Sequence, residues 1–191
     1  MFRRIAAILL ISLAPVLAQA VTLVRVDTTL GSFELELYED KAPETVANFV
    51  RYAEDGFYNG LIFHRVIDDW IVQGGGYEQD MQPRQTRAPI RNEAGKQLKN
   101  KRGTIAMARL FEPHSADSQF FINLQDSPNL DFRNESPTGY GYCVFGKVSQ
   151  GMDVVDSIGK VETGLVEDFS DVPLKPVIIN SVTVVSKPAQ N

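Results

Sequence analysis

The sequence is poor in the residues on which many active sites and small folds depend. Cysteine occurs once in 191 residues, as Cys143, so the chain can form no internal disulfide and contains no CxxC redox pair. The two histidines, His64 and His114, belong to no HExxH motif, and no GxSxG motif is present. These absences argue against a zinc hydrolase and against a serine hydrolase. We therefore expect no metal and no cofactor, and a core that stabilises the fold without disulfides.

Long apolar runs are also missing, except at the N-terminus. The stretch MFRRIAAILLISLAPVLAQA, residues 1–20, opens with Arg3 and Arg4, continues with a short apolar run and ends in small residues. This pattern is typical of a secretory signal peptide, and the run is short for a membrane span. We predict cleavage after Ala20, with an uncleaved anchor as the alternative. The mature protein is then exported to the periplasm, or secreted if the host lacks an outer membrane.

Positive charge is scarce in the predicted mature chain. Loss of the two arginines in residues 1–20 lowers Lys+Arg from 19 to 17 while Asp+Glu stays at 24, so the net charge moves from −5 to −7. An acidic protein is poorly suited to a phosphate backbone, so we expect no nucleic-acid partner and no membrane contact after signal removal. Residues 21–186 contain no repeat and no linker, which predicts a single domain followed by a flexible tail, residues 187–191.

The periodicity of the remaining chain predicts many short strands and two helices. Apolar and polar residues alternate over 22–37, which indicates two strands joined near 29–31. Apolar residues at helical spacing follow Pro43, which predicts a helix over 43–54, and a second helix is expected at 151–159. Further strands are expected within 103–110, 118–124, 142–148 and 177–185. An antiparallel barrel whose open ends are plugged by the helices is favoured over a sandwich.

One stretch combines apolar residues with a permanent cation. FHRVIDDWIVQGGG, residues 63–76, reads as a hairpin whose turn is at 68–69. On a pleated strand Arg65 shares a face with Phe63 and Ile67. Because burying an unpaired guanidinium is costly, Arg65 must pair with a carboxylate or an amide, or stand at the edge of an apolar groove where a ligand meets it. A surface arginine that extends its charge into water is the alternative.

Four blocks of this sequence resemble those of one known family. FHRVIDDWIVQGGG, GTIAMAR, SQFFIN and YCVFGKV, in this order and spacing, are similar to the cyclophilins, which are peptidyl-prolyl cis-trans isomerases. Together with the signal peptide, they resemble the exported bacterial type, and the likeness covers residues 21–186. It implies a mainly β fold, a closed eight-stranded antiparallel β-barrel capped by two α-helices. It also implies a monomer that acts on proline-containing unfolded or flexible polypeptides and assists the folding of exported proteins.

The resemblance also assigns the site residues. The catalytic arginine and glutamine of the family correspond to Arg65 and Gln73. Substrate binding is implied for Phe63, His64, Trp70, Ile71, Met107, Ala108, Arg109, Gln119, Phe121, Leu130 and Tyr142. Within this set the backbone around Ala108 is expected to hold the substrate chain, while Phe121 and Leu130 belong to the pocket for the proline ring. For His64 a hydrogen-bonded structural role is preferred to acid–base chemistry.

Three positions depart from the usual family pattern. Trp70-Ile71 replaces the common Phe-Met pair, Asn129 stands where many eukaryotic members have tryptophan, and the turn at 68–69 is Asp-Asp instead of Pro-Gly. Loss of that tryptophan leads us to expect weak cyclosporin binding with isomerase activity retained. Strand parity puts Trp70 opposite Ile71 and Gln73, so all three can line one pocket only if the strand twists or bulges there.

The implied reaction explains why the other catalytic motifs are missing. Rotation about an X–Pro amide breaks no covalent bond and therefore needs neither a nucleophile nor a metal. In the twisted amide the nitrogen gains a lone pair, and Arg65 is a donor that is always charged and cannot give up its proton. A non-catalytic peptide-binding or chaperone module on the same fold is the alternative function.

Overall fold

The structure, a computed structural model, describes residues 21–187. The predicted signal peptide, residues 1–20, and residues 188–191 of the predicted tail lie outside the described residues. Within the described part no helix is both long and apolar enough to cross a membrane.

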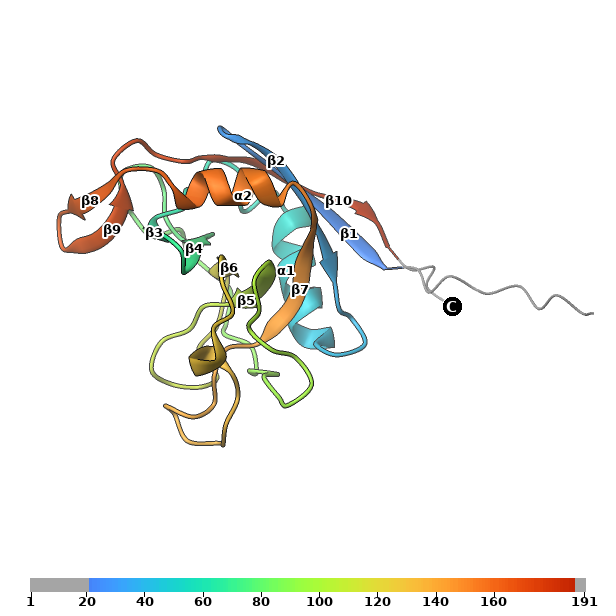
Figure 1. Cartoon of the computed structure of the whole chain (residues 1–191). Helices are drawn as coiled ribbons and strands as arrows, with labels where there is room; N and C mark the ends of the chain where they lie inside the picture. The colour runs from blue at the N-terminus through green and yellow to red at the C-terminus, as the bar shows by residue number, and fades with distance from the viewer. Residues whose placement is uncertain (1–20, 188–191) are drawn as a thin grey trace, which may run out of the picture.

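Eight antiparallel strands form one strongly curved sheet (Figure 1). The strands are β1 (Thr22–Thr28), β2 (Gly31–Leu37), β3 (Arg65–Ile67), β4 (Ile71–Gly74), β5 (Thr104–Met107), β6 (Phe120–Asn123), β7 (Val144–Gln150) and β10 (Ile179–Ser186). Their order in the sheet is β10-β1-β2-β7-β5-β6-β4-β3, so the two edges are β10 and β3. The alternation predicted for 22–37 is confirmed: β1 and β2 pair from Thr22 with Leu37 to Thr28 with Gly31.

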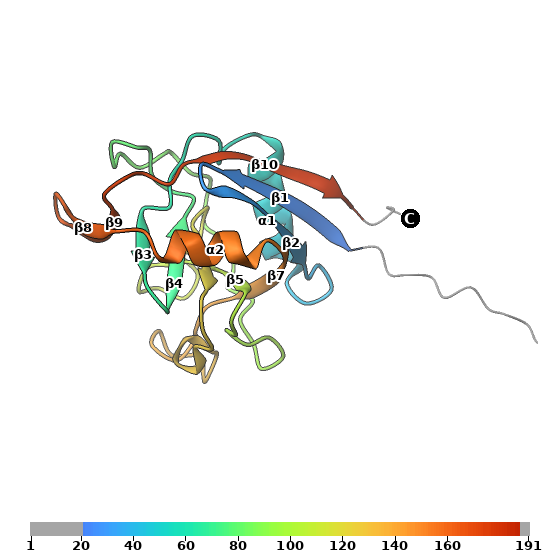
Figure 2. The ribbon, with the colours of Figure 1, turned by 45° about the horizontal axis from the view of Figure 1, so that its top comes forward.

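The prediction of a closed barrel is wrong, because the two edges of this sheet do not pair as strands. The neighbouring segments meet only at a bridge between Ile62 and Ile178 and a few backbone hydrogen bonds between residues 60–63 and 177–179. The three-residue strand β3 pairs with β4 on one side and with no strand of the described chain on its other side. That side is packed instead against a separate hairpin, β8 (Thr163–Val166) and β9 (Phe169–Pro173), which the sequence periodicity did not predict (Figures 1 and 2). Buried Val172 fixes this hairpin to a small cluster that includes Ile62. The exposed edge is thus covered and not paired.

Both predicted helices are confirmed as α1 (Pro43–Glu54) and α2 (Met152–Gly159). The buried face of α1 carries Phe49, whose ring lies 5.2–5.5 Å from the rings of Tyr58, Phe120 and Phe145. This contact links the helix to β6 and β7 in the centre of the main core. Helix α2 lies across an open end of the curved sheet and contacts β2, β3 and β4 (Figure 2).

A distant carboxylate caps the first turn of α1. The residue before the helix is Ala42, which offers no capping side chain. Glu93 takes that role: Oε2 accepts hydrogen bonds from the amide of Thr45 at 2.8 Å and from its hydroxyl at 2.7 Å, and Oε1 accepts one from the amide of Glu44 at 3.2 Å. A carboxylate at this end also interacts favourably with the helix dipole.

We predict that Glu93→Ala lowers the free energy of unfolding by about 1–2 kcal/mol, the usual cost of losing an N-cap. Urea unfolding followed by circular dichroism measures the change. Glu135→Ala, which removes the same side chain from an exposed loop position, is the matched control. Equal stability of the two variants would contradict the capping role.

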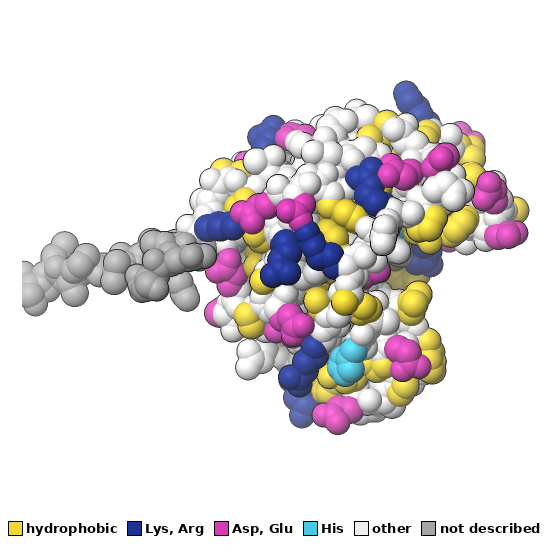
Figure 3. Space-filling view, turned by 180° about the vertical axis from the view of Figure 1, so that it is seen from behind, with side chains coloured by type: hydrophobic (Ala, Val, Ile, Leu, Met, Phe, Trp, Pro, Cys, Tyr) yellow, Lys and Arg dark blue, Asp and Glu magenta, His cyan; other side chains and the backbone are white. Residues whose placement is uncertain are grey.

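Charged side chains of both signs are interspersed on the face seen from behind, and basic residues form no continuous stripe there (Figure 3). Several basic residues of the described chain are paired with carboxylates. Arg102 holds both carboxylate oxygens of Asp156 at 2.8–2.9 Å, and Lys160 contacts Asp68 and Asp69 at 2.6 and 3.1 Å. The Lys160 contacts tie α2 to the β3–β4 turn.

Candidate active site

Two recesses lie side by side over β3 and β4, which contribute Arg65 and Gln73 to both. An apolar recess of about 270 Å³ is lined by Trp70, Ile71, Phe121, Leu130 and Tyr142. A polar recess of about 350 Å³ is lined by His64, Tyr77, Leu110, Ser115, Asp117, Gln119, Phe169 and Ser170. Both share one wall, made of Arg65, Gln73, Ala108 and Arg109. An extended chain that occupies both recesses therefore passes over this wall.

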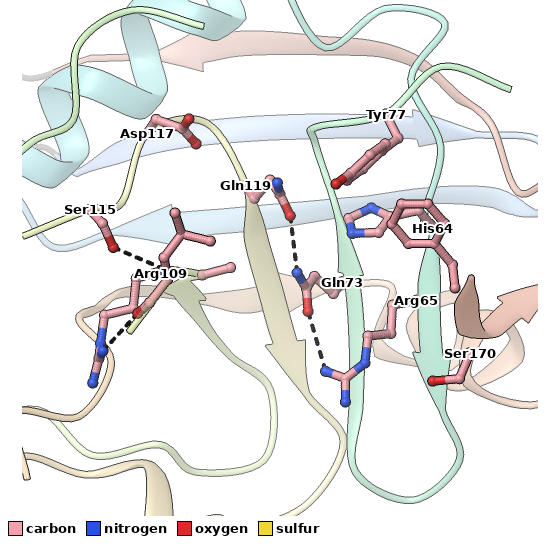
Figure 4. Close-up of a pocket in the computed structure, with 12 residues that line it drawn as sticks. His64, Arg65, Gln73, Tyr77, Arg109, Ser115, Asp117, Gln119 and Ser170 are labelled. Carbon is pink, nitrogen blue, oxygen red and sulfur yellow. Dashed lines mark hydrogen bonds between the residues drawn. The ribbon is translucent and has the colours of Figure 1, made fainter. Parts of the chain in front are cut away.

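A row of three polar side chains crosses this shared wall. Sheet register pairs Arg65 on β3 with Gln73 on β4, and Gln73 with Phe121 on β6. Gln119 precedes Phe121 by two residues, so its side chain lies near Gln73. Arg65 Nη1 donates to Gln73 Oε1 at 3.5 Å, and Gln73 Nε2 donates to Gln119 Oε1 at 3.1 Å (Figure 4). The Arg65 guanidinium also lies 5.7 Å from the centre of the Trp70 ring. With its side chain 36% exposed, Arg65 stands at the rim of both recesses, where a ligand can reach it.

The turn before β4 explains how Trp70 can line the same recess as Ile71 and Gln73. The amide of Trp70 donates to the carbonyl of Ile67 at 3.1 Å, and Asp69 has a left-handed backbone with φ of 55°. Trp70 is thus part of the turn, and the regular strand begins only at Ile71. Alternation does not apply across a turn, so Trp70 lines the apolar recess on the same side as Ile71 and Gln73.

The apolar recess has a rigid floor and an aromatic rim. Ile71 and Phe121 are 4% and 3% exposed and form the floor together with buried residues of β5 and β7. The Tyr142 ring meets Phe121 edge to face, with ring centres 5.5 Å apart. Leu130, at the end of a short 3₁₀ helix (Pro128–Leu130), completes the wall.

Arg109, one of the predicted substrate-binding residues, contributes its side chain to the site. Its guanidinium donates to the carbonyls of Gly141 and Pro137 at 2.9 Å, and to those of Leu110 and Phe111 at 2.9 and 3.0 Å. It also lies 4.9 Å from the centre of the Tyr142 ring, at the rim of the apolar recess. The side chain therefore joins the loops that border the two recesses.

Two residues predicted to bind substrate lie elsewhere. Phe63 and Met107 are 0% and 2% exposed and belong to the main core, so their side chains line neither recess. Regular strand geometry begins at Arg65, so the face expected to unite Arg65 with Phe63 does not exist. The amides of Met107 and Ala108 already donate to the carbonyls of Cys143 and Gln119 at 3.1 and 2.9 Å. A substrate strand cannot pair with those two amides.

His64 is buried beneath the polar recess. Its side chain is largely enclosed, with the residue 5% exposed, and its ring centre lies 4.6 Å from that of Tyr77. Among the described residues Nδ1 has no hydrogen-bond partner, so the expected hydrogen-bonded role is not seen at that atom. Burial, reinforced by the neighbouring charge of Arg65, lowers the pKa of His64 to about 4. The imidazole is consequently neutral at neutral pH.

The hairpin β8–β9 supplies site residues that sequence reasoning missed. Phe169 and Ser170 line the polar recess, and Asp171 Oδ2 lies 3.8 Å from Arg65 Nε. Glu167-Asp168, a polar pair between two short segments, was the only sign of a turn there. In residues 21–187 no group of three or more histidine, cysteine, aspartate or glutamate side chains is arranged to hold a metal ion. The wall that the two recesses share carries the Gln73 amide and the guanidinium groups of Arg65 and Arg109.

Comparison with known proteins decides the family. Residues 23–184 match the model of the family described as cyclophilin type peptidyl-prolyl cis-trans isomerase. The chain belongs to this family. Peptidyl-prolyl cis-trans isomerase B of Escherichia coli (strain K12) is 54% identical over 157 residues, which cover 82% of this chain and 96% of that protein. A peptidyl-prolyl cis-trans isomerase of Acinetobacter baylyi is 50% identical over 97% of both chains. The predicted enzyme class is thereby confirmed.

Solved structures agree with this assignment. A cyclophilin-type isomerase of Cryptosporidium parvum superposes with a TM-score of 0.71 at 26% identity, covering 88% of this chain and 99% of that one. The same kind of protein was solved in the presence of the dipeptide Ala-Pro, again with a TM-score of 0.71.

Packing leaves little room for a side chain at two of the three glycines after Gln73 in this cyclophilin. Gly75 has a φ of 85°, and a Cβ there would lie 2.9–3.0 Å from the rings of Phe120 and Tyr58. A Cβ on Gly76 would lie 2.6 Å from Cγ of Gln119. The first constraint concerns the core, whereas the second concerns the polar row of the site.

We predict that Gly76→Ala leaves the protein folded, because the crowded neighbour is a flexible side chain, but lowers kcat/KM several-fold. Displacement of Gln119 removes the partner of Gln73 Nε2 and loosens the row that ends at Arg65. The measurement is isomerase activity together with the thermal midpoint. Gly95→Ala, where a Cβ meets nothing nearer than 3.9 Å, is the matched control. Unchanged activity in Gly76→Ala would show that Gln119 is not needed.

Proposed function

We propose that this cyclophilin assists the folding of exported proteins by stabilising the twisted X–Pro amide with Arg65, while the apolar recess holds the proline ring. The observation that carries the proposal is the junction of the two recesses at Arg65 and Gln73. An amide that crosses this junction places its nitrogen within reach of a permanent donor.

The rate acceleration that the reaction requires is within reach of such a site. Rotation about the amide has a barrier of about 18–20 kcal/mol, and uncatalysed X–Pro exchange takes tens to hundreds of seconds. Exchange in milliseconds requires roughly a 10⁴–10⁵-fold acceleration, or about 5.5–7 kcal/mol of selective stabilisation. Fixed donors that act in a partly dry site contribute on the order of 3–4 kcal/mol each. Positioning of the substrate contributes the remainder.

The positions of the two recesses and of the wall between them suggest how the peptide binds and rotates. Ile71, Phe121 and Tyr142 hold the proline ring, and the residue before proline lies over the shared wall toward the polar recess. The preceding carbonyl then rotates while the ring stays fixed. At the twisted stage the nitrogen becomes pyramidal and accepts from Arg65, an interaction absent in both planar ground states.

Gln73 acts on Arg65 in this proposal. Its Oε1 faces the guanidinium, and its Nε2 is held by Gln119, so the amide of Gln73 cannot turn without losing one bond. A fixed acceptor limits the directions in which the Arg65 donors point.

The decisive experiment is NMR exchange on a proline-containing peptide with the purified protein. The proposal expects exchange between cis and trans signals to become faster in proportion to enzyme. Binding of the peptide without faster exchange would favour the non-catalytic peptide-binding or chaperone module. Acceleration of the proline-limited refolding of an exported protein tests the proposed cellular task.

Export and ligand preference have separate tests. N-terminal sequencing of the protein recovered from the periplasm is expected to begin at Val21, and an N-terminal Met1 would contradict cleavage. Weak cyclosporin binding is proposed because Asn129 offers neither an indole donor nor a flat apolar wall. Titration of the drug against isomerase activity measures it.

A further inference from the structure

We infer that Asp171, on the hairpin β8–β9, is a positioning residue that fixes the Arg65 guanidinium at the edge left free by Gln73. The inference rests on the proposed role of Arg65. It assigns a function to a hairpin that is separate from the main sheet and that contributes Phe169 and Ser170 to the polar recess.

The contact joins a different nitrogen of the guanidinium. Asp171 Oδ2 lies 3.8 Å from Arg65 Nε, whereas Gln73 Oε1 is bound by Nη1. The Ser170 hydroxyl donates to the same Asp171 oxygen at 3.1 Å, so the carboxylate is itself held. Figure 4 shows Ser170 on the other side of Arg65 from Gln73. The guanidinium is thus contacted along two separate edges.

The backbone at Asp171 is unusual and consistent with this role. Its φ is 60°, in the left-handed region that side chains other than glycine rarely adopt. Such a conformation persists where the surroundings enforce it. On one side Val172 is 3% exposed in the small core cluster, and on the other the Phe169 ring lies 5.4 Å from Tyr77. With Phe169 and Val172 packed in this way, the left-handed residue between them places its carboxylate 3.8 Å from Arg65 Nε.

Three groups then restrict the orientation of Arg65: the Gln73 amide, the face of Trp70 and the Asp171 carboxylate. Removing the carboxylate frees the Nε edge and lets the guanidinium turn away from the shared wall. Because Arg65 acts on a lone pair that exists only in the twisted amide, misorientation reduces kcat. Peptide binding in the apolar recess does not use Asp171 and is expected to stay the same.

The test compares Asp171→Asn with Asp168→Asn. Asp168 lies on the exposed turn of the same hairpin, so the control loses the same charge at a position that makes no ion pair with Arg65. We expect Asp171→Asn to lower kcat about three- to tenfold, as a loosened catalytic group does, and Asp168→Asn to keep wild-type kcat. Trp70 is the single tryptophan and lines the apolar recess, so its fluorescence reports peptide Kd, which is expected to be unchanged in both.

Two further measurements separate positioning from a structural role. Asp171→Gly removes both the carboxylate and the strained side-chain conformation, so it is expected to match or exceed wild-type thermal stability while losing kcat like Asp171→Asn. Salt screens a partly exposed ion pair, so kcat of the wild type is expected to fall at high ionic strength toward that of Asp171→Asn, whose own kcat stays flat.

The outcomes separate the role of Asp171 from that of Arg65. Equal kcat for Asp171→Asn and Asp168→Asn overturns the positioning role. It is also overturned if Asp171→Gly is less stable than the wild type, binds peptide more weakly and has a lower kcat. The activity of Arg65→Ala, measured in the same experiment, tests the proposed mechanism. A fully active Arg65→Ala excludes the proposed mechanism. An inactive Arg65→Ala beside a fully active Asp171→Asn excludes only the positioning role of Asp171.

Discussion

Arg65→Ala is expected to lower kcat/KM by about 10²–10³-fold, the usual cost of losing one donor that acts on the transition state. The fold should survive, because the side chain is 36% exposed and makes one long hydrogen bond and one ion pair at the rim of the recesses. Peptide binding is expected to weaken far less than turnover, since Ile71 and Phe121, which form the floor, remain in place. Loss of kcat with nearly unchanged Kd is the signature of an interaction made in the twisted state.

Cis–trans exchange rates by NMR and peptide binding by Trp70 fluorescence measure the two quantities separately. Arg65→Lys is expected to be impaired as well, because an ammonium cannot reproduce the planar fork of the guanidinium. Arg25→Ala removes the same side chain from the surface of β1 and serves as the control. Full activity in Arg65→Ala would remove the proposed mechanism.

Wild-type stability is expected to fall by about 3 kcal/mol between pH 7 and pH 4 on account of His64 alone. Burial, reinforced by the charge of Arg65, lowers the folded-state pKa from 6.5 to about 4. Between pH 6.5 and about pH 4, His64 is protonated in the unfolded chain but stays neutral in the folded protein. Proton binding therefore stabilises the unfolded state, and the free energy of unfolding falls as the pH is lowered. Each unit of pKa difference corresponds to about 1.36 kcal/mol, which gives the size and the sign of the effect.

Urea unfolding over this pH range measures the slope. His64→Gln, which cannot titrate, is expected to lose this part of the pH dependence, and His114→Gln at an exposed position is the control. The same slope in His64→Gln and wild type would show that the folded protein protonates His64 as readily as the unfolded chain. The depressed pKa also means that kcat should show no step from His64 between pH 5 and pH 8.

Local patterns were sufficient for most of the secondary structure. Alternation over 22–37 and helical spacing after Pro43 depend on near neighbours, and both were confirmed. The hairpin β8–β9 was missed because its segments are short and partly polar, and because left-handed backbone at Glu167 and Asp171 has no sequence signal. Its folding depends on packing against β3 and Tyr77, which are about a hundred residues earlier in the chain.

Closure of the sheet was wrongly expected for a similar reason. The ends of a sheet meet only if the edge strands are long enough and in register, and neither property can be read from one segment. Here β3 is short, and β9 packs against its free side. The placement of Phe63 and Met107 in the core follows equally from where regular strands begin and end.

The sequence by itself determined the family, the two helices, the strands of the main sheet and the identity of the polar pair, Arg65 and Gln73. These follow from short-range periodicity and from motifs in a fixed order. Only the tertiary structure decided which side chains share a wall, that Trp70 turns into the apolar recess, and that Asp171 reaches Arg65. The physical reason is that the shared wall and the Asp171 contact join segments distant in the chain, while the placement of Trp70 depends on a left-handed turn residue that the sequence pattern does not reveal.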